Sequence, residues 1–364
     1  GDLGDERARP STIEVCQPFV SDSSVSPAKD CVGNDYTMIT DRVLKPQEQS
    51  DMDISDISAV DVKYISEFTK LLFPDGPTLI PTDERFVNEK MSRPSQVADR
   101  LRCESEVGQG NASSSFTKAE SYRKVNAPRL ITQVKSMRKW IYAKYIYPLA
   151  EYLKTLPMYA PGKIPAEVAD RVSSVCEFAL IHGYAIAKTD YSRFDGTVNA
   201  FLRYFFFEVL RMGYGDYVFS EEGLKDLNVQ MFLQEVVTAL GPYFTGFALG
   251  SGMMDTSCIG GLCNMFNAYS YLRDIGFSPE EAWRMLGIYQ GDDGLSVIPH
   301  SPEAYIETVR RHGQVLELDL VTPGCGRVEF LARVYSPRVW YGSPDSCCDI
   351  DRQLSKLSRV TAGN

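Results

Sequence analysis

The sequence predicts an α+β fold, in which long helices pack against short strands. Long stretches repeat apolar residues at helical spacing, and between them lie short runs of consecutive apolar residues bounded by Gly, Pro or acidic residues, as in buried strands. The 364 residues are 44% apolar and 24% charged. With no internal repeat, this composition excludes a coiled coil, a collagen-like repeat and a wholly disordered chain.

The first sixty residues differ from the rest in composition. They hold 12 Asp and Glu against 5 Lys and Arg, which accounts for −7 of the chain's net charge of −10. They are rich in Ser, Asp and Pro and show no sustained periodicity. We therefore expect residues 1–60 to be an acidic N-terminal extension, partly disordered or draped over another surface.

Regular elements are expected along most of the remaining chain. Apolar spacing predicts helices at residues 61–73, 133–156, 166–182, 199–212, 256–274 and 302–312. Short apolar runs predict a strand at residues 183–189, two strands around a turn within 286–298, and a strand at 315–321. Residues 327–334 and 338–341 are expected to be extended, and a loop-rich stretch is expected from residue 74 to about residue 110.

The apolar runs and the cysteines indicate whether the chain could span a membrane and in which kind of cellular compartment it folds. The densest apolar patch, residues 204–210, is far shorter than the ~18–20 residues that a membrane helix needs, so we expect it in the core. Nine scattered Cys and three distant His argue against a zinc site or a disulfide framework and for a reducing compartment. The N-terminus has neither a signal pattern nor an initiator Met, so Gly1 is expected to lie at a boundary within a longer polypeptide.

Two acidic residues follow the strand predicted at residues 183–189. Asp190 and Asp195 are five residues apart, which fits neither the period of two of a strand nor the three- or four-residue spacing of one helix face. They converge only if the strand ends near Asp190 and the chain turns before a helix near Gly196. The alternative for Asp195 is a plain helix N-cap.

A second acidic pair, Asp292 and Asp293, lies in a Gly-Asp-Asp-Gly turn between two apolar segments. By composition this is a hairpin turn, and a turn without further function is the alternative. Adjacent strand residues point to opposite sides, so we expect only Asp292 to share a site with Asp190. Their hard oxygen ligands suit two Mg²⁺ (or Mn²⁺) ions, which can activate a hydroxyl and stabilise a leaving pyrophosphate.

Two further segments carry features that suit a phosphate ligand. Ser251 stands between glycines in a loop that leads to Thr256 at a helix start, although such a loop is most often only a loop. Residues 118–144 hold eight Lys and Arg and one acid, either as a phosphate-binding segment or as a solvated helix face. Within them, Arg129 precedes an apolar pair and could clamp a triphosphate bidentately.

Together these four segments resemble the RNA-dependent RNA polymerases of positive-strand RNA viruses, most of all the nodavirus replicases and their tombusvirus-like relatives. The order is that of the family: a basic Lys-x-Glu…Pro-Arg-x-Ile segment (motif F), Asp-x4-Asp (motif A), Ser-Gly-x3-Thr (motif B) and Gly-Asp-Asp (motif C). The resemblance covers about residues 110–340.

The resemblance implies a right-hand fold with an antiparallel palm sheet packed on helices. Fingers would occupy residues 61–183, including a nucleotide-entry segment at 116–131, the palm residues 184–334, and the start of a truncated thumb residues 335–364. It implies template-directed RNA synthesis from nucleoside triphosphates by a two-metal nucleotidyl transfer in viral genome replication. The open alternatives are a reverse-transcriptase-like DNA polymerase and a non-catalytic RNA-binding or structural fragment of a replication complex.

The resemblance also assigns residues. Asp190, Asp292 and Asp293 would be the catalytic and metal-binding group. Asp195 would sense the ribose 2′-hydroxyl, and the other nucleotide contacts would be Lys118, Arg123, Arg129, Ser251 and Thr256. Phe330 and Arg333, in Glu329–Arg333, would belong to a primer grip (motif E).

This sequence departs from the pattern of many relatives at two places. Gly260 stands where they have an Asn that joins in sugar selection, so Asn264, one helical turn later, is the candidate here. Where relatives carry a Lys as general acid for pyrophosphate, the candidates are Arg311 and His312, of which His312 has the better pKa for proton transfer near neutrality. A helix cap or surface residue is the alternative for His312.

The resemblance further implies partners and a location. The partners would be template and product RNA, nucleoside triphosphates, and other replicase regions or copies. Membrane attachment would use regions outside this chain, and the place of action would be the host cytoplasm, at a membrane-associated viral replication complex.

Overall fold

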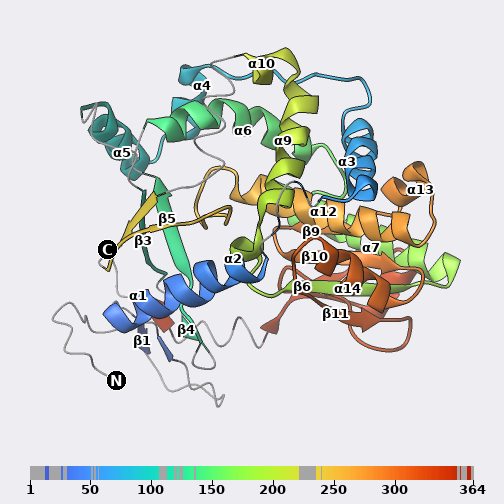
Figure 1. The fold of residues 1–364 in the computed structure, drawn as a ribbon. Coiled ribbons are helices and arrows are strands. Elements are labelled where there is room, and N and C mark those ends of the chain that lie inside the picture. The colour runs from blue at the N-terminus through green and yellow to red at the C-terminus, as the bar shows by residue number, and fades with distance from the viewer. Residues whose placement is uncertain are drawn as a thin grey trace.

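The computed structural model describes most of the chain. The described residues are 13–15, 26–27, 31–50, 52, 55, 57–105, 113–118, 121–122, 126–134, 137–220, 235–238, 240–350, 353 and 359–361. The expected α+β class is confirmed, since long helices surround several small sheets (Figure 1).

The largest sheet of the C-terminal half has four antiparallel strands in the order β11–β6–β10–β9. They are β6 (Ala185–Tyr191), β9 (Ile288–Gln290), β10 (Asp293–Ile298) and β11 (Leu316–Val321), all where apolar runs predicted strands. β9 and β10 form a hairpin in which Asp293 pairs with Gln290, so Gly291 and Asp292 make a two-residue loop. Gly291 has a φ of 61°, a left-handed conformation that this kind of loop needs.

Long helices pack on this sheet and on one another. α7 (Pro165–His182) contacts β6, β9 and β10, while α12 (Thr256–Asp274) contacts β9 and α14 (Pro302–Arg311). The core continues between α3 (Ala59–Leu72), α6 (Arg138–Lys154) and α9 (Ala200–Tyr214). Phe68 of α3 packs edge-on, at centroid distances of 5.3–5.6 Å, against the rings of Phe205, Phe266, Tyr269 and Trp283. The aromatic patch at residues 204–210 thus contributes to the core, as expected, with Phe205 and Phe206 fully buried.

A second four-stranded sheet has the order β5–β3–β7–β8. Its strands are β3 (Ser113–Thr117), β5 (Leu130–Val134), β7 (Glu235–Thr238) and β8 (Gly241–Phe244). β3 and β7 are parallel, and the other two pairs are antiparallel. The basic segment and the residues that precede the Gly-Ser loop therefore share one sheet.

The N-terminal region contains helical structure where an extended arm was expected. α1 (Val32–Ile39) continues through a π-helical turn, η1 (Thr40–Leu44), into α2 (Lys45–Gln49) (Figure 1). Its apolar residues Met38, Ile39 and Val43 form a small core with Leu130 of β5 and Ala248. The remainder of the expected extension, including residues 1–12, 16–25 and 28–30, lies outside the described residues.

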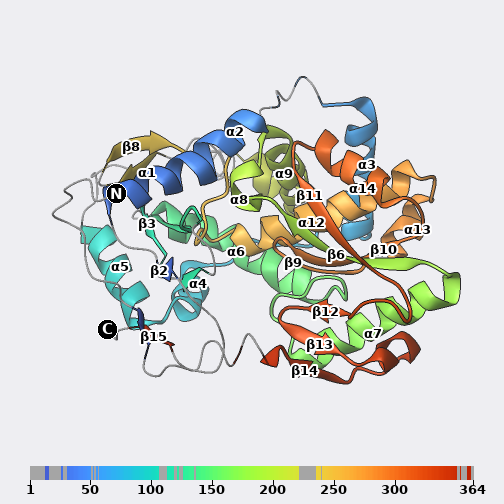
Figure 2. The same ribbon diagram turned by 90° about the horizontal axis from the view of Figure 1, so that it is seen from below.

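Shorter elements complete the fold. The third sheet, β12 (Glu329–Phe330), β13 (Arg333–Tyr335) and β14 (Ser346–Cys348), lies beside α7 (Figure 2). Two-residue or three-residue strands pair as β1 (Ile13–Val15) with β15 (Arg359–Thr361) and β2 (Ser26–Pro27) with β4 (Ser121–Tyr122). The short helices are α4 (Glu84–Lys90), α5 (Pro94–Ser105), α8 (Phe194–Thr197), α10 (Asp216–Phe219), α13 (Pro279–Arg284) and the 3₁₀ helix η3 (Pro337–Tyr341).

Two local predictions were wrong. The stretch expected to be loop-rich contains α4 and α5, because Asp83 caps α4 by accepting from the Phe86 amide at 2.8 Å and Pro94 opens α5. Residues 338–341, expected to be extended, belong to η3, which begins at Pro337, a residue that suits a first helical position.

Two findings bear on membranes and cysteines. Within the described residues, the helices are too short or too polar to cross a membrane. The eight cysteines in this part of the chain have free thiols.

Candidate active site

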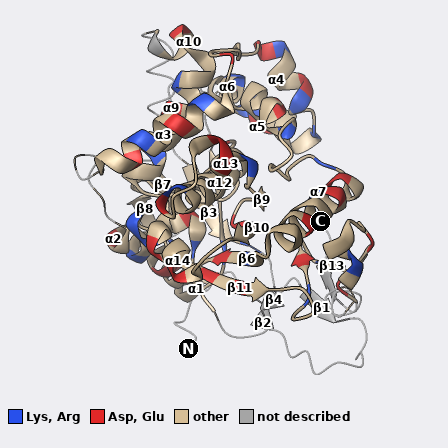
Figure 3. Ribbon diagram, turned by 90° about the vertical axis from the view of Figure 1, so that its right-hand side faces the viewer, with Lys and Arg blue, Asp and Glu red and all other residues tan. Residues whose placement is uncertain are grey.

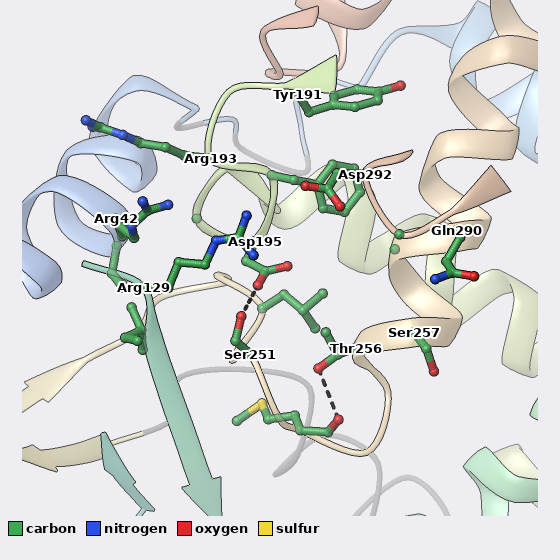
Figure 4. Close-up of a pocket in the computed structure, with 18 of the residues that line it drawn as sticks. Arg42, Arg129, Tyr191, Arg193, Asp195, Ser251, Thr256, Ser257, Gln290 and Asp292 are labelled. Atoms are coloured by element: carbon green, nitrogen blue, oxygen red, sulfur yellow. Dashed lines mark hydrogen bonds between the residues drawn. The ribbon is translucent and has the colours of Figure 1, made fainter. Parts of the chain in front are cut away.

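One pocket gathers side chains from segments that are far apart in the sequence (Figure 4). Its volume is about 510 Å³, and η1, β5, the turn after β6, the loop before α12, α12 itself and the β9–β10 loop line it. Six of the residues that the sequence singled out are among its lining: Arg129, Asp190, Asp195, Ser251, Thr256 and Asp292. The four segments therefore converge as the sequence predicted.

Strand pairing brings the two acidic segments to one end of the central sheet. Thr189 of β6 pairs with Gly294 of β10, so Asp190 lies level with Asp293. The loop between β9 and β10 carries Asp292 at the same end, and Asp292 is the member of that pair that lines the pocket beside Asp190. The sequence reasoning chose Asp292 over Asp293 from strand alternation, but Asp292 lies in the loop, and the strand residue level with Asp190 is Asp293.

Burial and charge both act on the Asp292 carboxyl. Burial raises its pKa, and the negative charge of Asp190 raises it further, while Arg129 and backbone amides lower it. The two carboxylates thus repel each other across a shared space. Such a pair favours a cation between its members.

A further carboxylate near Asp190, outside the pocket lining, was missed by the sequence reasoning. Glu317 of β11 pairs directly with Asp190 of β6, and opposite residues of an antiparallel pair point to the same face. β11 carries two acidic residues, Glu317 and Asp319, and β6 carries one, Asp190 (Figure 3 colours acidic residues red). The signal was available in the sequence, because the alternation Leu-Glu-Leu-Asp-Leu-Val places Glu317 and Asp319 on one side of the strand.

A tight turn returns Asp195 to the end of the sheet. Arg193 adopts a left-handed backbone with φ of 55° and is the N-cap of α8, so the alternative of Asp195 as the cap is wrong. The Asp195 carboxylate accepts a hydrogen bond from the Ser251 hydroxyl. Burial raises the pKa of Asp195 to about 6; the Ser251 hydrogen bond opposes this rise, and the charge of Asp292 adds to it.

The loop that carries Ser251 is fixed at both ends. The Thr132 amide of β5 donates to the Ser251 carbonyl at 2.7 Å, and Gly252 has a φ of 97° that a side chain rarely adopts. Thr256 donates its hydroxyl to the carbonyls of Gly250 and Met253, at 2.9 and 3.0 Å. Thr256 therefore closes the loop, in addition to lining the pocket.

A buried ion pair anchors the base of this loop. Arg203 of α9 lies 3.3 Å from Asp255, which also accepts from the Tyr142 hydroxyl at 2.8 Å. The same guanidinium donates to the carbonyls of Phe247 and Ala248, at 2.9 and 3.0 Å. A loop conformation that separated Arg203 from Asp255 would leave a buried charge without its partner. Such conformations are costly, so the ion pair favours the one loop conformation that is seen.

The basic segment contributes Arg129 to the pocket. Arg129 precedes β5 and is exposed, and its carbonyl accepts from the Lys118 amide at 2.8 Å. Lys118 follows β3 and is not part of the pocket lining. Arg123 lies outside the described residues.

The assignment of Asn264 as a nucleotide contact is corrected by the structure. Asn264 is fully buried in α12, and its amide nitrogen donates to the carbonyls of Gly291 and Asp292, at 3.1 and 3.2 Å. Its oxygen accepts from the Tyr191 hydroxyl at 3.2 Å. Asn264 therefore holds the hairpin loop in place instead of facing the pocket.

The assignment of His312 and Arg311 as general acid is also corrected. His312 is fully buried against the rings of Phe201 and Phe266 and contacts Asn267 at 2.7 Å and Asp61 at 3.3 Å. Arg311 lies 3.1 Å from Asp61 and 2.9 Å from Asp274. Neither side chain lines the pocket, and both bind α14 to neighbouring helices.

The predicted primer-grip residues lie on the expected hairpin. Phe330 is buried on β12, and Arg333 on β13 donates to the Ser346 hydroxyl at 3.0 and 3.1 Å. Leu331 and Ala332 form the turn with φ of 49° and 57°. These side chains are not part of the pocket lining, and their proposed contact with a primer stays a prediction.

Two cationic residues in the pocket were not predicted. Arg42 from η1 and Arg193 from the turn after β6 join Arg129 in the lining (Figure 4). Arg193 had a local signal, since it stands between the two acids of the Asp-x4-Asp segment. Arg42 had none, because its segment was expected to be an irregular arm.

Comparison with known proteins gives related viral enzymes. Residues 169–318 match the family described as viral RNA-dependent RNA polymerase. The chain is 31% identical over 311 residues to the RNA-directed RNA polymerase of Pieris rapae virus, covering 83% of this chain and 30% of that protein. It is 31% identical over 303 residues to that of Atlantic halibut nervous necrosis virus, covering 81% and 30%, and 29% identical over 288 residues to that of Pariacoto virus, covering 76% and 28%. The chain thus spans about a third of the length of these relatives.

Solved structures agree with the fold. The RNA-dependent RNA polymerase of a human picobirnavirus superposes with a TM-score of 0.71 at 15% identity, over 90% of this chain and 66% of that one. An insertion-loop deletion mutant of the same polymerase gives a TM-score of 0.70. The resemblance predicted from the four motifs is confirmed, and so is the α+β polymerase fold.

Proposed function

We propose that this chain, a relative of the viral RNA-dependent RNA polymerases, joins nucleoside triphosphates into RNA on an RNA template during viral genome replication. One observation carries the proposal. Asp190 and Asp292, from segments about a hundred residues apart, line one pocket together with Asp195 and Arg129. An acidic pair that can hold metal ions and a cation that can neutralise phosphate charge are groups that metal-assisted phosphoryl transfer uses.

The donor set suits divalent metal ions, which polymerases of this family generally use. Asp190 and Asp292 offer only oxygen ligands, and their mutual repulsion favours a cation. Within the part of the chain that the structure describes, no group of three or more His, Cys, Asp or Glu is arranged to hold a metal alone. This fits Mg²⁺, which binds through one or two carboxylates plus substrate phosphates. We propose that Asp190 and Asp292, with Asp293 adjacent, hold two Mg²⁺ or Mn²⁺ ions, which would supply activation of a hydroxyl and neutralisation of the pyrophosphate charge.

The chain's own residues bind and orient the substrates in this proposal. The 3′-hydroxyl of the growing strand attacks the α-phosphate, the bond to the β-phosphate breaks, and pyrophosphate leaves. Arg129 neutralises triphosphate charge, as Lys118 and Arg123 of the same segment would. Asp195 accepts a hydrogen bond from the ribose 2′-hydroxyl, and Ser251 orients the Asp195 carboxylate.

We also propose the division into fingers (61–183), palm (184–334) and the start of a thumb (335–364). The separate sheets support it, because β3 and β5 belong to one sheet and β6, β9, β10 and β11 to another. One refinement follows from the pairing. β7 and β8, although they lie between palm segments in sequence, join the sheet of β3 and β5 and so belong with the fingers.

Partners and location follow from the same proposal. Template and product RNA and nucleoside triphosphates are the expected ligands, and other replicase regions or copies the expected partners. We further propose that the chain acts in the host cytoplasm at a membrane-associated replication complex, with membrane attachment through regions outside this chain. Fractionation of cells that express the complete viral polypeptide tests the location.

The experiment that tests the function is nucleotide incorporation on a defined primed RNA template, with and without Mg²⁺ or Mn²⁺. Asp190→Asn and Asp292→Asn should each lower incorporation about 10³-fold or more, because each removes a charge needed in the transition state. Asp319→Asn, a matched loss of an exposed carboxylate on β11, should retain it.

Two results would contradict the proposal. Near-normal Mg²⁺-dependent incorporation by Asp190→Asn or Asp292→Asn would refute the site. RNA binding without any metal-dependent extension would favour a non-catalytic RNA-binding module, and preference for deoxynucleotides would favour a reverse-transcriptase-like enzyme.

A further inference from the structure

The side chain of Gln47 in α2 joins two segments of the pocket. Its amide nitrogen donates to the carbonyls of Gly196 and Val198, both at 2.8 Å. Its oxygen accepts from the Phe247 amide, also at 2.8 Å. One neutral side chain thus satisfies three backbone groups that are about 150 and 200 residues away in sequence.

These backbone groups flank Asp195, which is proposed above to contact the ribose, and Ser251, which is proposed to orient the Asp195 carboxylate. Gly196 directly follows Asp195, and Phe247 lies four residues before Ser251. The Asp195 carbonyl accepts from the Leu249 amide at 2.8 Å, and the Asp195 carboxylate accepts from Ser251. Gln47 is therefore a third link between the turn that carries Asp195 and the strand-to-loop segment that carries Ser251.

Close packing fixes the helix against this turn. A Cβ at Gly196 would lie 2.1 Å from the Arg42 carbonyl oxygen, so the helix backbone contacts the turn directly. Arg42 lies in the π-helical turn η1, which continues into α2 with Gln47, and π-turns inside helices occur often at functional sites. Pro46, next to Gln47, is buried in the same contact.

The same helix also holds the opposite side of the pocket. The Arg42 guanidinium donates to the carbonyls of Ala127 and Pro128, at 2.7 to 3.0 Å. These residues directly precede Arg129. One helical segment therefore bridges two sides of the pocket, with Arg42 bound to the residues before Arg129 and Gln47 bound to the turn after Asp195.

We propose that Gln47 is a positioning residue that fixes the orientation of Asp195 and thereby sets the preference for ribonucleotides over deoxyribonucleotides. The inference rests on the proposed polymerase function. Gln47 acts only through the backbone around Asp195. Its loss therefore weakens the contact that depends on the 2′-hydroxyl and spares contacts that both kinds of nucleotide share.

The test compares Gln47→Met with the unaltered protein in steady-state incorporation of a ribonucleotide and the matching deoxyribonucleotide on one primed RNA. Met preserves length and volume but offers no amide. The ratio of kcat/KM for the two nucleotides should fall about tenfold, through a loss confined to the ribonucleotide, since the three hydrogen bonds of the amide to the backbone are lost. A purely structural role would lower the active fraction and so reduce both values by the same factor.

Gln49→Met is the matched control, because Gln49 is exposed in the same helix. Its ratio should equal that of the unaltered protein. Gln47→Glu is the second variant, in case Gln47→Met does not fold, because it keeps the acceptor for Phe247 and turns a second acceptor toward the two carbonyls. It should lower the ratio at least as much as Gln47→Met does.

A double-mutant cycle with Asp195→Asn completes the test. If Gln47 acts through Asp195, then Gln47→Met should not change the ratio further once Asp195 is replaced. This inference about Gln47 is overturned if Gln47→Met leaves the ratio unchanged or lowers kcat/KM equally for both nucleotides, provided that incorporation by the unaltered protein depends on Asp190. If the unaltered protein shows no Asp190-dependent incorporation, the proposed function itself fails.

Discussion

The Ser251 hydroxyl donates a hydrogen bond to the Asp195 carboxylate, which joins the loop before α12 to the turn after β6. Asp195 is an acid in a setting that disfavours its ionised form, since burial raises its pKa to about 6. The Ser251 hydrogen bond stabilises the ionised form and opposes this rise. The pair therefore sets both the orientation and the charge of the group proposed to read the sugar.

Replacement of Ser251 by Ala should weaken ribonucleotide selection. The carboxylate loses a donor to a charged group, a contact worth about 1.5–3 kcal/mol, so kcat/KM for a ribonucleotide should fall at least tenfold. The loss for a deoxyribonucleotide should be smaller, since the 2′-hydroxyl is absent. Ser174→Ala, which removes an exposed hydroxyl of α7 outside the pocket lining, is the control. Equal losses for both nucleotides in Ser251→Ala would contradict a role through Asp195.

The preference for ribonucleotides should depend on pH. The ionised carboxylate is the stronger acceptor for a 2′-hydroxyl, and Asp195 is ionised only above its pKa of about 6. The ribonucleotide-to-deoxyribonucleotide ratio should therefore fall as the pH drops from 8 to 5, with a midpoint near 6. Groups that contact both kinds of nucleotide change both kcat/KM values by the same factor when they titrate, so their effect cancels in the ratio. A ratio that stays constant over this range would contradict the assignment of Asp195.

The same pKa has a consequence for stability with a definite sign. Because the folded pKa of Asp195 lies above the ordinary value of 3.8, the folded state binds the proton more tightly, and Asp195 lowers stability as the pH rises from about 4 to about 6. Asp195→Asn removes this cost. The variant should match the unaltered protein near pH 4 and exceed its free energy of unfolding at pH 8 by on the order of 1 kcal/mol, after allowance for solvent screening. Chemical denaturation at the two pH values measures the difference, and a destabilised variant at pH 8 would contradict it.

Gly260 explains one departure of this sequence from its relatives. A Cβ at Gly260 would lie 2.9 Å from the Gly291 Cα, so α12 and the β9–β10 loop approach too closely for a side chain. Gly260→Ala should displace Asp292 and lower incorporation at least tenfold, because small displacements of a metal ligand are costly. Gly276→Ala, in open space but at a φ of 100°, should lose stability without this loss of activity. Normal activity in Gly260→Ala would show that the loop has room to move.

The sequence predicted the acidic part of the site because its signals are local. A strand that ends at Asp190, a turn before Asp195 and a two-residue loop at Asp292 each follow from neighbouring residues. Strand alternation, by contrast, does not explain why Asp292 lines the pocket, because Asp292 lies in the loop and Asp293 is the strand residue level with Asp190. The spacing of apolar residues, the Gly and Asp residues of the turns and the carboxylate side chains all indicated the same site. The convergence of these distant segments could therefore be predicted without an alignment.

The sequence could not predict the helix that spans the site. Arg42 and Gln47 bind backbone carbonyls of residues 127, 128, 196 and 198. Every residue type has a backbone carbonyl, so the sequence does not show which residues will accept these hydrogen bonds. Asn264 failed for a related reason. Helical spacing placed it one turn beyond Gly260, but spacing does not show that the hairpin loop covers it.

His312 offers a last test of the difference between a catalytic and a structural histidine. It is fully buried, and burial lowers its pKa although Asp61 opposes the shift. His312→Gln should therefore destabilise the fold by about 2–3 kcal/mol, through lost ring packing and imperfect hydrogen bonds to Asn267 and Asp61. It should leave the alkaline limb of the kcat–pH profile in place, since a group outside the pocket does not protonate pyrophosphate. Thermal unfolding and single-turnover rates from pH 6 to 9 measure both effects, with the exposed His300→Gln as the matched control. A loss of activity with unchanged stability, together with a displaced alkaline limb, would return His312 to the list of general-acid candidates.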